Sequence, residues 1–144
     1  GLGGTGNNAP RIRLFEKFSR LGYKFPCFIH PSTFVGGTAV FGDGSVVMAG
    51  AAVQAGCRVG RNVIINTGAV IDHDCVLGNH SHIAPGAVLS GNVSVGTGAH
   101  IGTGAVVIQN IRVGEGALVA AGAVVVRDVL PRATVMGVPA RERT

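Results

Sequence analysis

Three consecutive polar residues, Asp72, His73 and Asp74, stand out in a segment that otherwise holds small and apolar residues. Carboxylates beside an imidazole favour its protonated form, so such a histidine is a stronger base than a free one. General-base catalysis needs a group of this kind. From these residues alone, a solvated histidine without a chemical role is the equally plain alternative.

The segment around His73 belongs to a six-residue repeat that runs from Ile29 to about Leu130. Each of seventeen successive blocks opens with an apolar residue, and thirteen of them carry Ala, Ser, Thr or Cys at the fifth position. This period is typical of a parallel β-helix in which each block is one short strand and one corner. The large opener fills the interior, and the small fifth residue lies where two sides converge. Glycines at the second and fourth positions suit the backbone angles of corners.

Composition excludes several classes of protein. The 144 residues predict one compact unit. The net charge of +5 is dispersed over both ends of the chain, and with no Trp and one Tyr there is no basic stripe with stacking aromatics, so we expect no nucleic-acid partner. No apolar run reaches the length of a membrane span and no signal peptide is visible. Three cysteines suit a reducing compartment, which predicts a cytoplasmic protein, and Cys57 and Cys75 are expected to be buried and inert.

The N-terminal segment predicts a helix over residues 10–21. Pro10 suits the first turn and Gly22 is a good stop. The expected apolar face, which we predict to cover the open edge of the first coil, consists of Ile12, Phe15, Phe18 and Leu21. Residues 1–6 match the spacing of the dinucleotide-binding glycine motif. The match does not predict a dinucleotide site, because that motif requires a preceding strand, which this sequence does not show.

The repeat resembles that of the hexapeptide-repeat proteins, which form a left-handed parallel β-helix with three blocks per coil. The resemblance implies an all-β fold of about five to six coils with a short N-terminal helix cap. Residues eighteen apart would then stack in columns about 4.8 Å apart. We expect three segments. Residues 1–28 would be the remnant of a sugar-nucleotide-binding domain with the capping helix, residues 29–130 the β-helix acyltransferase domain, and residues 131–144 a C-terminal cap and tail.

Residues 70–78, 81–86 and 89–92 resemble a narrower group, the sialic-acid O-acetyltransferases and the bacillosamine-pathway sugar N-acetyltransferases. The closing residues 135–140 are similar to the segment that ends hexapeptide acyltransferases. The resemblance implies acetyl transfer from acetyl-CoA to a nucleotide-linked sugar. It also implies a homotrimer with active sites between subunits and no metal.

The same resemblance implies roles for individual residues. His73 would be the catalytic base, Asp74 would raise its basicity, and Gly91, eighteen residues after His73, would offer its N–H to the thioester oxygen. Gly6 and Asn7 match a substrate-binding Gly-Asn-Asn segment. Contacts with the cofactor are implied for His82, Thr103, Ala121 and Gly122.

Four functions are weighed. The first is N-acetylation of an amino group on a nucleotide-linked amino-deoxy sugar, and the second is O-acetylation of a sialic-acid hydroxyl. The third is a metal enzyme like the γ-class carbonic anhydrases, and the fourth is a scaffold without catalysis. The metal enzyme would draw its ligands from four histidines, His73, His80, His82 and His100. The arginines considered either for CoA phosphates or as solvated charges are Arg127, Arg132 and Arg141.

Overall fold

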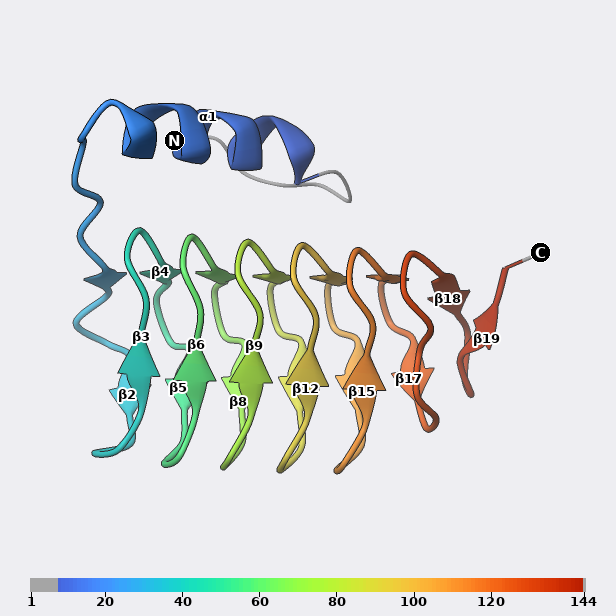
Figure 1. Cartoon of the computed structure of the whole chain (residues 1–144). Coiled ribbons are helices and arrows are strands. Elements are labelled where there is room, and N and C mark those ends of the chain that lie inside the picture. Colours follow the sequence, from blue (N-terminus) through green and yellow to red (C-terminus); the bar gives the residue numbers. More distant parts are fainter. Residues whose placement is uncertain (1–7, 144) are drawn as a thin grey trace.

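The computed structural model describes residues 8–143 and consists of a β-solenoid of about six coils with one helix along its side (Figure 1). Three strands of two or three residues make each coil, and three parallel sheets run the length of the solenoid. The prediction of an all-β solenoid with one short N-terminal helix is confirmed. No helix of the described chain has the length and apolar character that a membrane crossing requires.

The three sheets form the three faces of a prism. Sheet A holds β1 (Phe28–Ile29), β4 (Val46–Val47), β7 (Ile64–Ile65), β10 (His82–Ile83), β13 (His100–Ile101), β16 (Leu118–Val119), β18 (Thr134–Met136) and β19 (Arg141–Glu142). Sheet B holds β2 (Phe34–Val35), β5 (Ala52–Val53), β8 (Val70–Ile71), β11 (Val88–Leu89), β14 (Val106–Val107) and β17 (Val124–Val125). Sheet C holds β3 (Val40–Phe41), β6 (Arg58–Val59), β9 (Val76–Leu77), β12 (Ser94–Val95) and β15 (Arg112–Val113). We name the corners between faces the A–B, B–C and C–A corners.

Neighbouring coils pair in a register of eighteen residues, as the repeat predicts. Val70 pairs with Val88, and Ile71 pairs with Leu89. The second residue of each strand is a block opener and points inward, so Ile71 and Leu89 are fully buried. At the first coil no preceding coil covers the interior, and Ile29 keeps 41% of its surface exposed.

At the last coil the step between paired residues shortens from the predicted eighteen residues to sixteen. Leu118 pairs with Thr134, a step of sixteen residues, and Val129 forms a bridge with Val113. Val129 therefore occupies the place of a block opener rather than the fifth position assigned to it. Residues 131–143 then add β18 and the antiparallel β19 to sheet A.

The helix α1 (Ala9–Arg20) lies along the C–A corner and does not cover the end of the first coil (Figure 1). The Asn8 side chain donates to the carbonyl of Gly98, while the Arg11 guanidinium donates to the carbonyls of Asn62 and His80. A helical turn rises about 5.4 Å and coils are about 4.8 Å apart, so each turn of the helix meets about one coil. This match explains why the helix aligns with the solenoid axis.

The buried face of α1 is only partly the predicted one. Phe15 is buried against Phe25 and His80, but Phe18 and Leu21 are exposed. Arg11 takes part in the buried face because the corner offers carbonyl groups, which need donors once water is removed. The prediction from apolar spacing missed this because it considered apolar partners alone.

Candidate functional site

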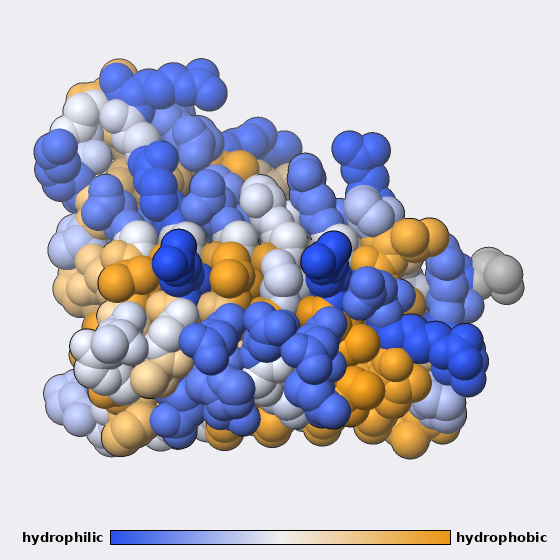
Figure 2. All heavy atoms as spheres, turned by 60° about the horizontal axis from the view of Figure 1, so that its bottom comes forward, coloured by the Kyte–Doolittle hydropathy of each residue, from blue (hydrophilic) through white to orange (hydrophobic). Residues whose placement is uncertain are grey.

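The predicted catalytic pair lies on the B–C corner that follows β8. Nδ1 of His73 and Oδ2 of Asp74 are 2.9 Å apart. A carboxylate can only accept, so Nδ1 carries the proton and Nε2 of the neutral ring remains an acceptor. The hydrogen bond with Asp74 and the negative charge of Asp72 raise the pKa of His73 above its ordinary value. Figure 2, in which the lower corner of Figure 1 comes forward, shows hydrophilic residues gathered over the middle coils of this corner.

Two glycines of the neighbouring coils make room for this pair. Gly91 is buried beneath the imidazole, and a Cβ placed on it would lie 2.5 Å from Nε2 of His73. A Cβ on Gly56 would lie 2.2 Å from Oδ1 of Asp74. Asp74 itself has a left-handed backbone, with φ of 59°, a conformation that Asp tolerates better than most residues. The site therefore depends on small residues one coil to either side, and Gly56 was not predicted as part of it.

The backbone of Gly91 is the group that we expect to contact the acetyl group. Within the described residues its N–H donates no hydrogen bond, while its carbonyl accepts from the N–H of Asn110 at 3.1 Å. Among residues 8–143, no third residue of a block donates its N–H to the backbone bonds between coils, so this amide is available at the corner.

Two cysteines lie behind the site. Cys57 and Cys75 are fully buried free thiols that stack one coil apart. Their Sγ atoms donate to the carbonyls of Asp72 and Ser90 at 3.0 and 3.3 Å. The interaction with the Cys57 thiol, followed by burial, raises the pKa of the Cys75 thiol. The prediction of buried packing residues is confirmed, and neither sulfur is accessible as a nucleophile.

The predicted cofactor residues meet at a different corner. His82, Thr103 and Ala121 line one groove of about 520 Å³, on the outer face of sheet A and the adjoining A–B corner. The N–H of Gly122 donates to the carbonyl of Thr103 at 2.9 Å, which places Gly122 at the same corner. Thr103 and Ala121 are eighteen residues apart and stack in one column, whereas His82 and Gly122 belong to other columns that reach the same corner.

Two further residues of this groove were not among the predicted contacts. Nδ2 of Asn66 lies 3.3 Å from Nε2 of His82, and the His82 and His100 rings meet edge to face with centroids 4.7 Å apart. Burial lowers the pKa of His100. His100 could have been found from its spacing of eighteen after His82, but Asn66 lies at the A–B corner of the preceding coil, sixteen residues before His82, and has no such spacing.

The two groups of residues do not come together within one chain. Strand β11 of sheet B separates the A–B corner from the B–C corner, and the groove contains neither His73 nor Gly91. Gly6 and Asn7 lie outside the described residues.

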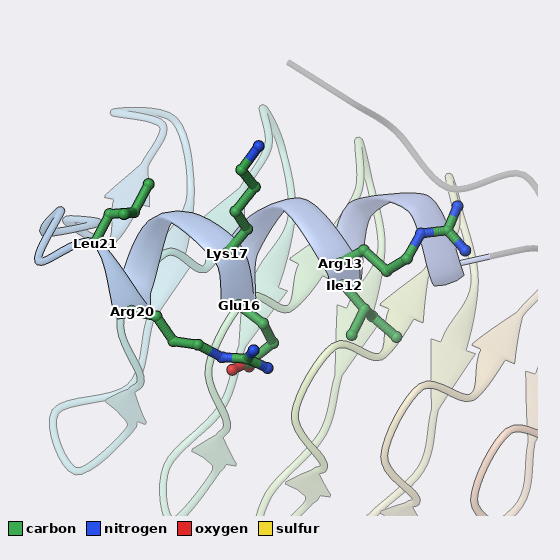
Figure 3. A pocket seen from close by; sticks show the side chains of 6 residues that line it. All are labelled: Ile12, Arg13, Glu16, Lys17, Arg20 and Leu21. Carbon is green, nitrogen blue, oxygen red and sulfur yellow. The ribbon is translucent and has the colours of Figure 1, made fainter.

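A separate hollow of about 580 Å³ lies along α1 and contains none of the predicted site residues. Its lining includes Ile12, which projects toward the coils, and Lys17, which projects away from them (Figure 3). The described residues contain no group of three or more His, Cys, Asp or Glu side chains placed to hold a metal ion.

Comparison with known proteins identifies the family. The model of the family described as bacterial transferase hexapeptide (six repeats) matches residues 38–73, 56–91 and 74–109, which together span half of the chain. No curated protein sequence matches the chain. Solved structures match it over nearly its whole length.

Three of these structures are informative. One is the perosamine N-acetyltransferase PerB from Caulobacter crescentus in complex with CoA and GDP-perosamine, which is 43% identical over 97% of this chain and 68% of its own, with a TM-score of 0.94. The acetyltransferase domain of PglB from Neisseria gonorrhoeae, in complex with acetyl coenzyme A, is 47% identical over 96% of this chain and 68% of its own, with a TM-score of 0.93. WeeI from Acinetobacter baumannii is 30% identical over 96% of this chain and 68% of its own, with a TM-score of 0.92. The chain therefore belongs to the hexapeptide-repeat family of acetyl-CoA-dependent nucleotide-sugar N-acetyltransferases.

Proposed function

We propose that this chain transfers the acetyl group of acetyl-CoA directly to an amino group of a nucleotide-linked amino-deoxy sugar. The observation that carries the proposal is the His73–Asp74 pair, whose imidazole lies over Gly91 with Nε2 free to accept a proton. The bound GDP-perosamine of the Caulobacter relative supports an amino sugar as the acceptor. We keep a sugar hydroxyl as the alternative acceptor that the experiment distinguishes.

In the proposed step, the nitrogen of the acceptor amine attacks the thioester carbon while Nε2 of His73 takes a proton from that amine. The N–H of Gly91 donates to the carbonyl oxygen while negative charge develops there. The new C–N bond forms, the C–S bond breaks, and CoA leaves as the thiolate. Asp74 holds the ring in the required tautomer and stabilises its protonated form. A covalent acyl-enzyme is not required, because Cys57 and Cys75, the thiols nearest the base, are buried.

We assign the groove at the A–B corner to acetyl-CoA. A pantetheine arm is long, narrow and partly apolar, and the groove follows the solenoid axis over several coils. Thr103, Ala121 and Gly122 would contact this arm, while His82 and Asn66 would lie nearer to the acetyl end. Gly6 and Asn7 remain proposed contacts of the sugar nucleotide.

We further infer a homotrimer in which one copy presents its His73 corner to the groove of the next copy. The separation of the two corners supports this arrangement, because a single chain holds the base and the groove apart. The outer face of sheet B, which joins the two corners, also carries an apolar column, made by Phe34, Ala52, Val70, Val88, Val106 and Val124. By contrast, the outward residues of sheet C include Arg58, Ser94 and Arg112. Because the three cysteines are free, we keep the cytoplasm as the proposed location.

The test is release of the CoA thiol from acetyl-CoA with a panel of nucleotide-linked amino sugars. Wild-type protein should turn over with an amino sugar, and His73→Asn should reduce kcat by 10²-fold or more. The matched control is His30→Asn, which replaces an exposed histidine on the first coil and should leave kcat unchanged. Full activity in His73→Asn would refute the proposed base, and turnover with hydroxyl acceptors alone would select the alternative.

The shared site needs a separate test. A His73→Asn subunit and a Thr103→Trp subunit should each be inactive alone, because one lacks the base and the other blocks the groove. Mixed trimers should recover activity, since some interfaces then join an intact His73 to an intact groove. A mixture that stays inactive while forming mixed trimers would contradict a site shared between copies.

A further inference from the structure

We propose that Cys75 is a positioning residue that orients the peptide group whose N–H belongs to Gly91. Its thiol lies behind the B–C corner and touches none of the reacting atoms of the proposed acetyl transfer. This role rests on the proposed function, because it requires the Gly91 N–H to contact the acetyl oxygen. A buried thiol thereby has a role that packing alone does not give it.

The hydrogen bond of Cys75 reaches the peptide that joins Ser90 to Gly91. Sγ of Cys75 donates to the carbonyl oxygen of Ser90 at 3.3 Å, and within residues 8–143 this carbonyl accepts no other hydrogen bond. Cys75 is fully buried, so the carbonyl points toward the interior. The Ser90–Gly91 peptide is trans, and in a trans peptide the C=O and the N–H point in opposite directions. The N–H of Gly91 therefore points away from the interior, and the His73 ring lies over the same residue.

The column of this corner shows that the thiol bonds serve two particular peptides. One coil earlier, Sγ of Cys57 donates to the carbonyl of Asp72 at 3.0 Å, and that peptide leads into His73. On the coils before and after these two, the same position is held by Gln54 and Ile108, whose carbonyls accept no hydrogen bond within the described part of the chain. The corner thus forms without such a bond, and the thiols fix the direction of the peptides that carry the proposed base and the proposed oxyanion donor.

A difference between these two peptides explains why only one offers its N–H. The N–H of His73 donates to Oδ1 of Asp72 at 2.7 Å, so that amide is already engaged. Ser90 stands in the place of Asp72, and in residues 8–143 the N–H of Gly91 makes no hydrogen bond with it or with any other group. The bond that the Ser90 carbonyl accepts also makes the Gly91 N–H a stronger donor, because hydrogen bonds in a chain polarise one another.

The repeat itself shows which substitutions test this role. Ser45 holds the equivalent fifth position of an earlier block, and its Oγ donates to the carbonyl of Gly60 at 2.7 Å. Alanine is also compatible with the fifth position, where Ala69 is fully buried. Cys75→Ser should therefore keep a hydrogen bond to Ser90, whereas Cys75→Ala removes it and leaves the solenoid intact.

The kinetic experiment compares these two variants in the thiol-release assay. We expect Cys75→Ala to lower kcat by about 10-fold, a part of the roughly 10² to 10³-fold that one oxyanion donor contributes. The KM for acetyl-CoA should change by less than about twofold, because the contact strengthens only as charge develops on the oxygen. Cys75→Ser should recover most of the lost kcat. The matched control is Ser45→Ala, which removes the same kind of buried hydrogen bond at the C–A corner and should keep kcat.

A second measurement observes the Gly91 amide directly and needs no acceptor sugar. In the wild type, acetyl-CoA should shift the amide proton resonance of Gly91 downfield, because a hydrogen bond to the acetyl oxygen deshields that proton. Cys75→Ala should reduce this shift, and Cys75→Ser should restore it. If Cys75→Ala folds poorly, Cys75→Val takes its place, because Val93 is buried at the same position of the next coil.

The outcomes separate orientation from packing. Unchanged kcat and an unchanged Gly91 shift in Cys75→Ala would overturn the role of Cys75. A fall in kcat without a smaller Gly91 shift, or a fall that Cys75→Ser does not recover, would overturn it as well. Wild-type protein that shows the shift but transfers no acetyl group would contradict the proposed function alone. Binding of acetyl-CoA without any shift would overturn the contact of Gly91, and with it the role of Cys75.

Discussion

Replacing Gly91 with alanine places a methyl group where the imidazole of His73, the proposed base, lies. The new Cβ would be 2.5 Å from Nε2 and 2.6 Å from Cε1 of His73, both closer than side-chain atoms tolerate. The ring is exposed and can swing away, so we expect displacement of the base rather than disruption of the solenoid. Movement of the ring also breaks its 2.9 Å hydrogen bond with Asp74.

The expected magnitude differs between activity and stability. A correctly placed general base contributes about 10² to 10⁴-fold, so Gly91→Ala should lower kcat by roughly 10²-fold or more. The backbone of Gly91 is outside the left-handed region, so alanine fits it and should change the free energy of unfolding by less than about 1 kcal/mol. The melting temperature should therefore stay close to that of wild type.

A matched control lies in the same column. Gly37 occupies the same block position three coils earlier, and a Cβ placed on it has no atom within 4 Å. Gly37→Ala should keep both kcat and the melting temperature. The assay is thiol release at saturating acetyl-CoA beside a thermal melt. If Gly91→Ala retained kcat within about threefold while His73→Asn lost it, the position of the ring over Gly91 would be wrong.

Two further predictions concern pH and the helix. Because Asp74 raises the pKa of His73, and the base acts only when unprotonated, kcat/KM should fall as the pH drops through that raised pKa. Asp74→Asn should move this acidic limb to lower pH and reduce the maximal rate, and an unmoved limb in its pH profile would contradict the pairing. Arg11→Met should leave the carbonyls of Asn62 and His80 without donors and cost about 3 kcal/mol, seen as faster amide exchange in α1. Unchanged exchange would show that these bonds do not hold the helix.

Much of the solenoid was readable from the sequence because its information is local and periodic. An apolar opener every six residues specifies which side chain of each short strand points inward, as Ile71 and Leu89 illustrate. Once three blocks make a coil, spacing of eighteen predicts neighbours, so Gly91 was expected beside His73. The adjacency of His73 and Asp74 is likewise a property of the chain itself.

Tertiary structure alone decided how the remaining parts lie. The apolar spacing of α1 predicted that Phe18 and Leu21 would belong to its buried face, but both side chains are exposed. The helix instead follows the C–A corner, where Arg11 meets carbonyls from separate coils. The groove residue Asn66 was equally unpredictable, since it reaches His82 from the A–B corner of the preceding coil and not along a column.

The physical reason is the difference between a repeat and a contact. Hydrophobic burial acts on every block alike, so it leaves an apolar residue every six positions, which the amino-acid sequence shows directly. Polar contacts between corners, or between α1 and a corner, depend on where carbonyl groups and side chains of distant coils are oriented in space. The sequence by itself thus determined the solenoid and the His73–Asp74 pair, whereas tertiary structure decided that this pair and the groove lie on separate corners.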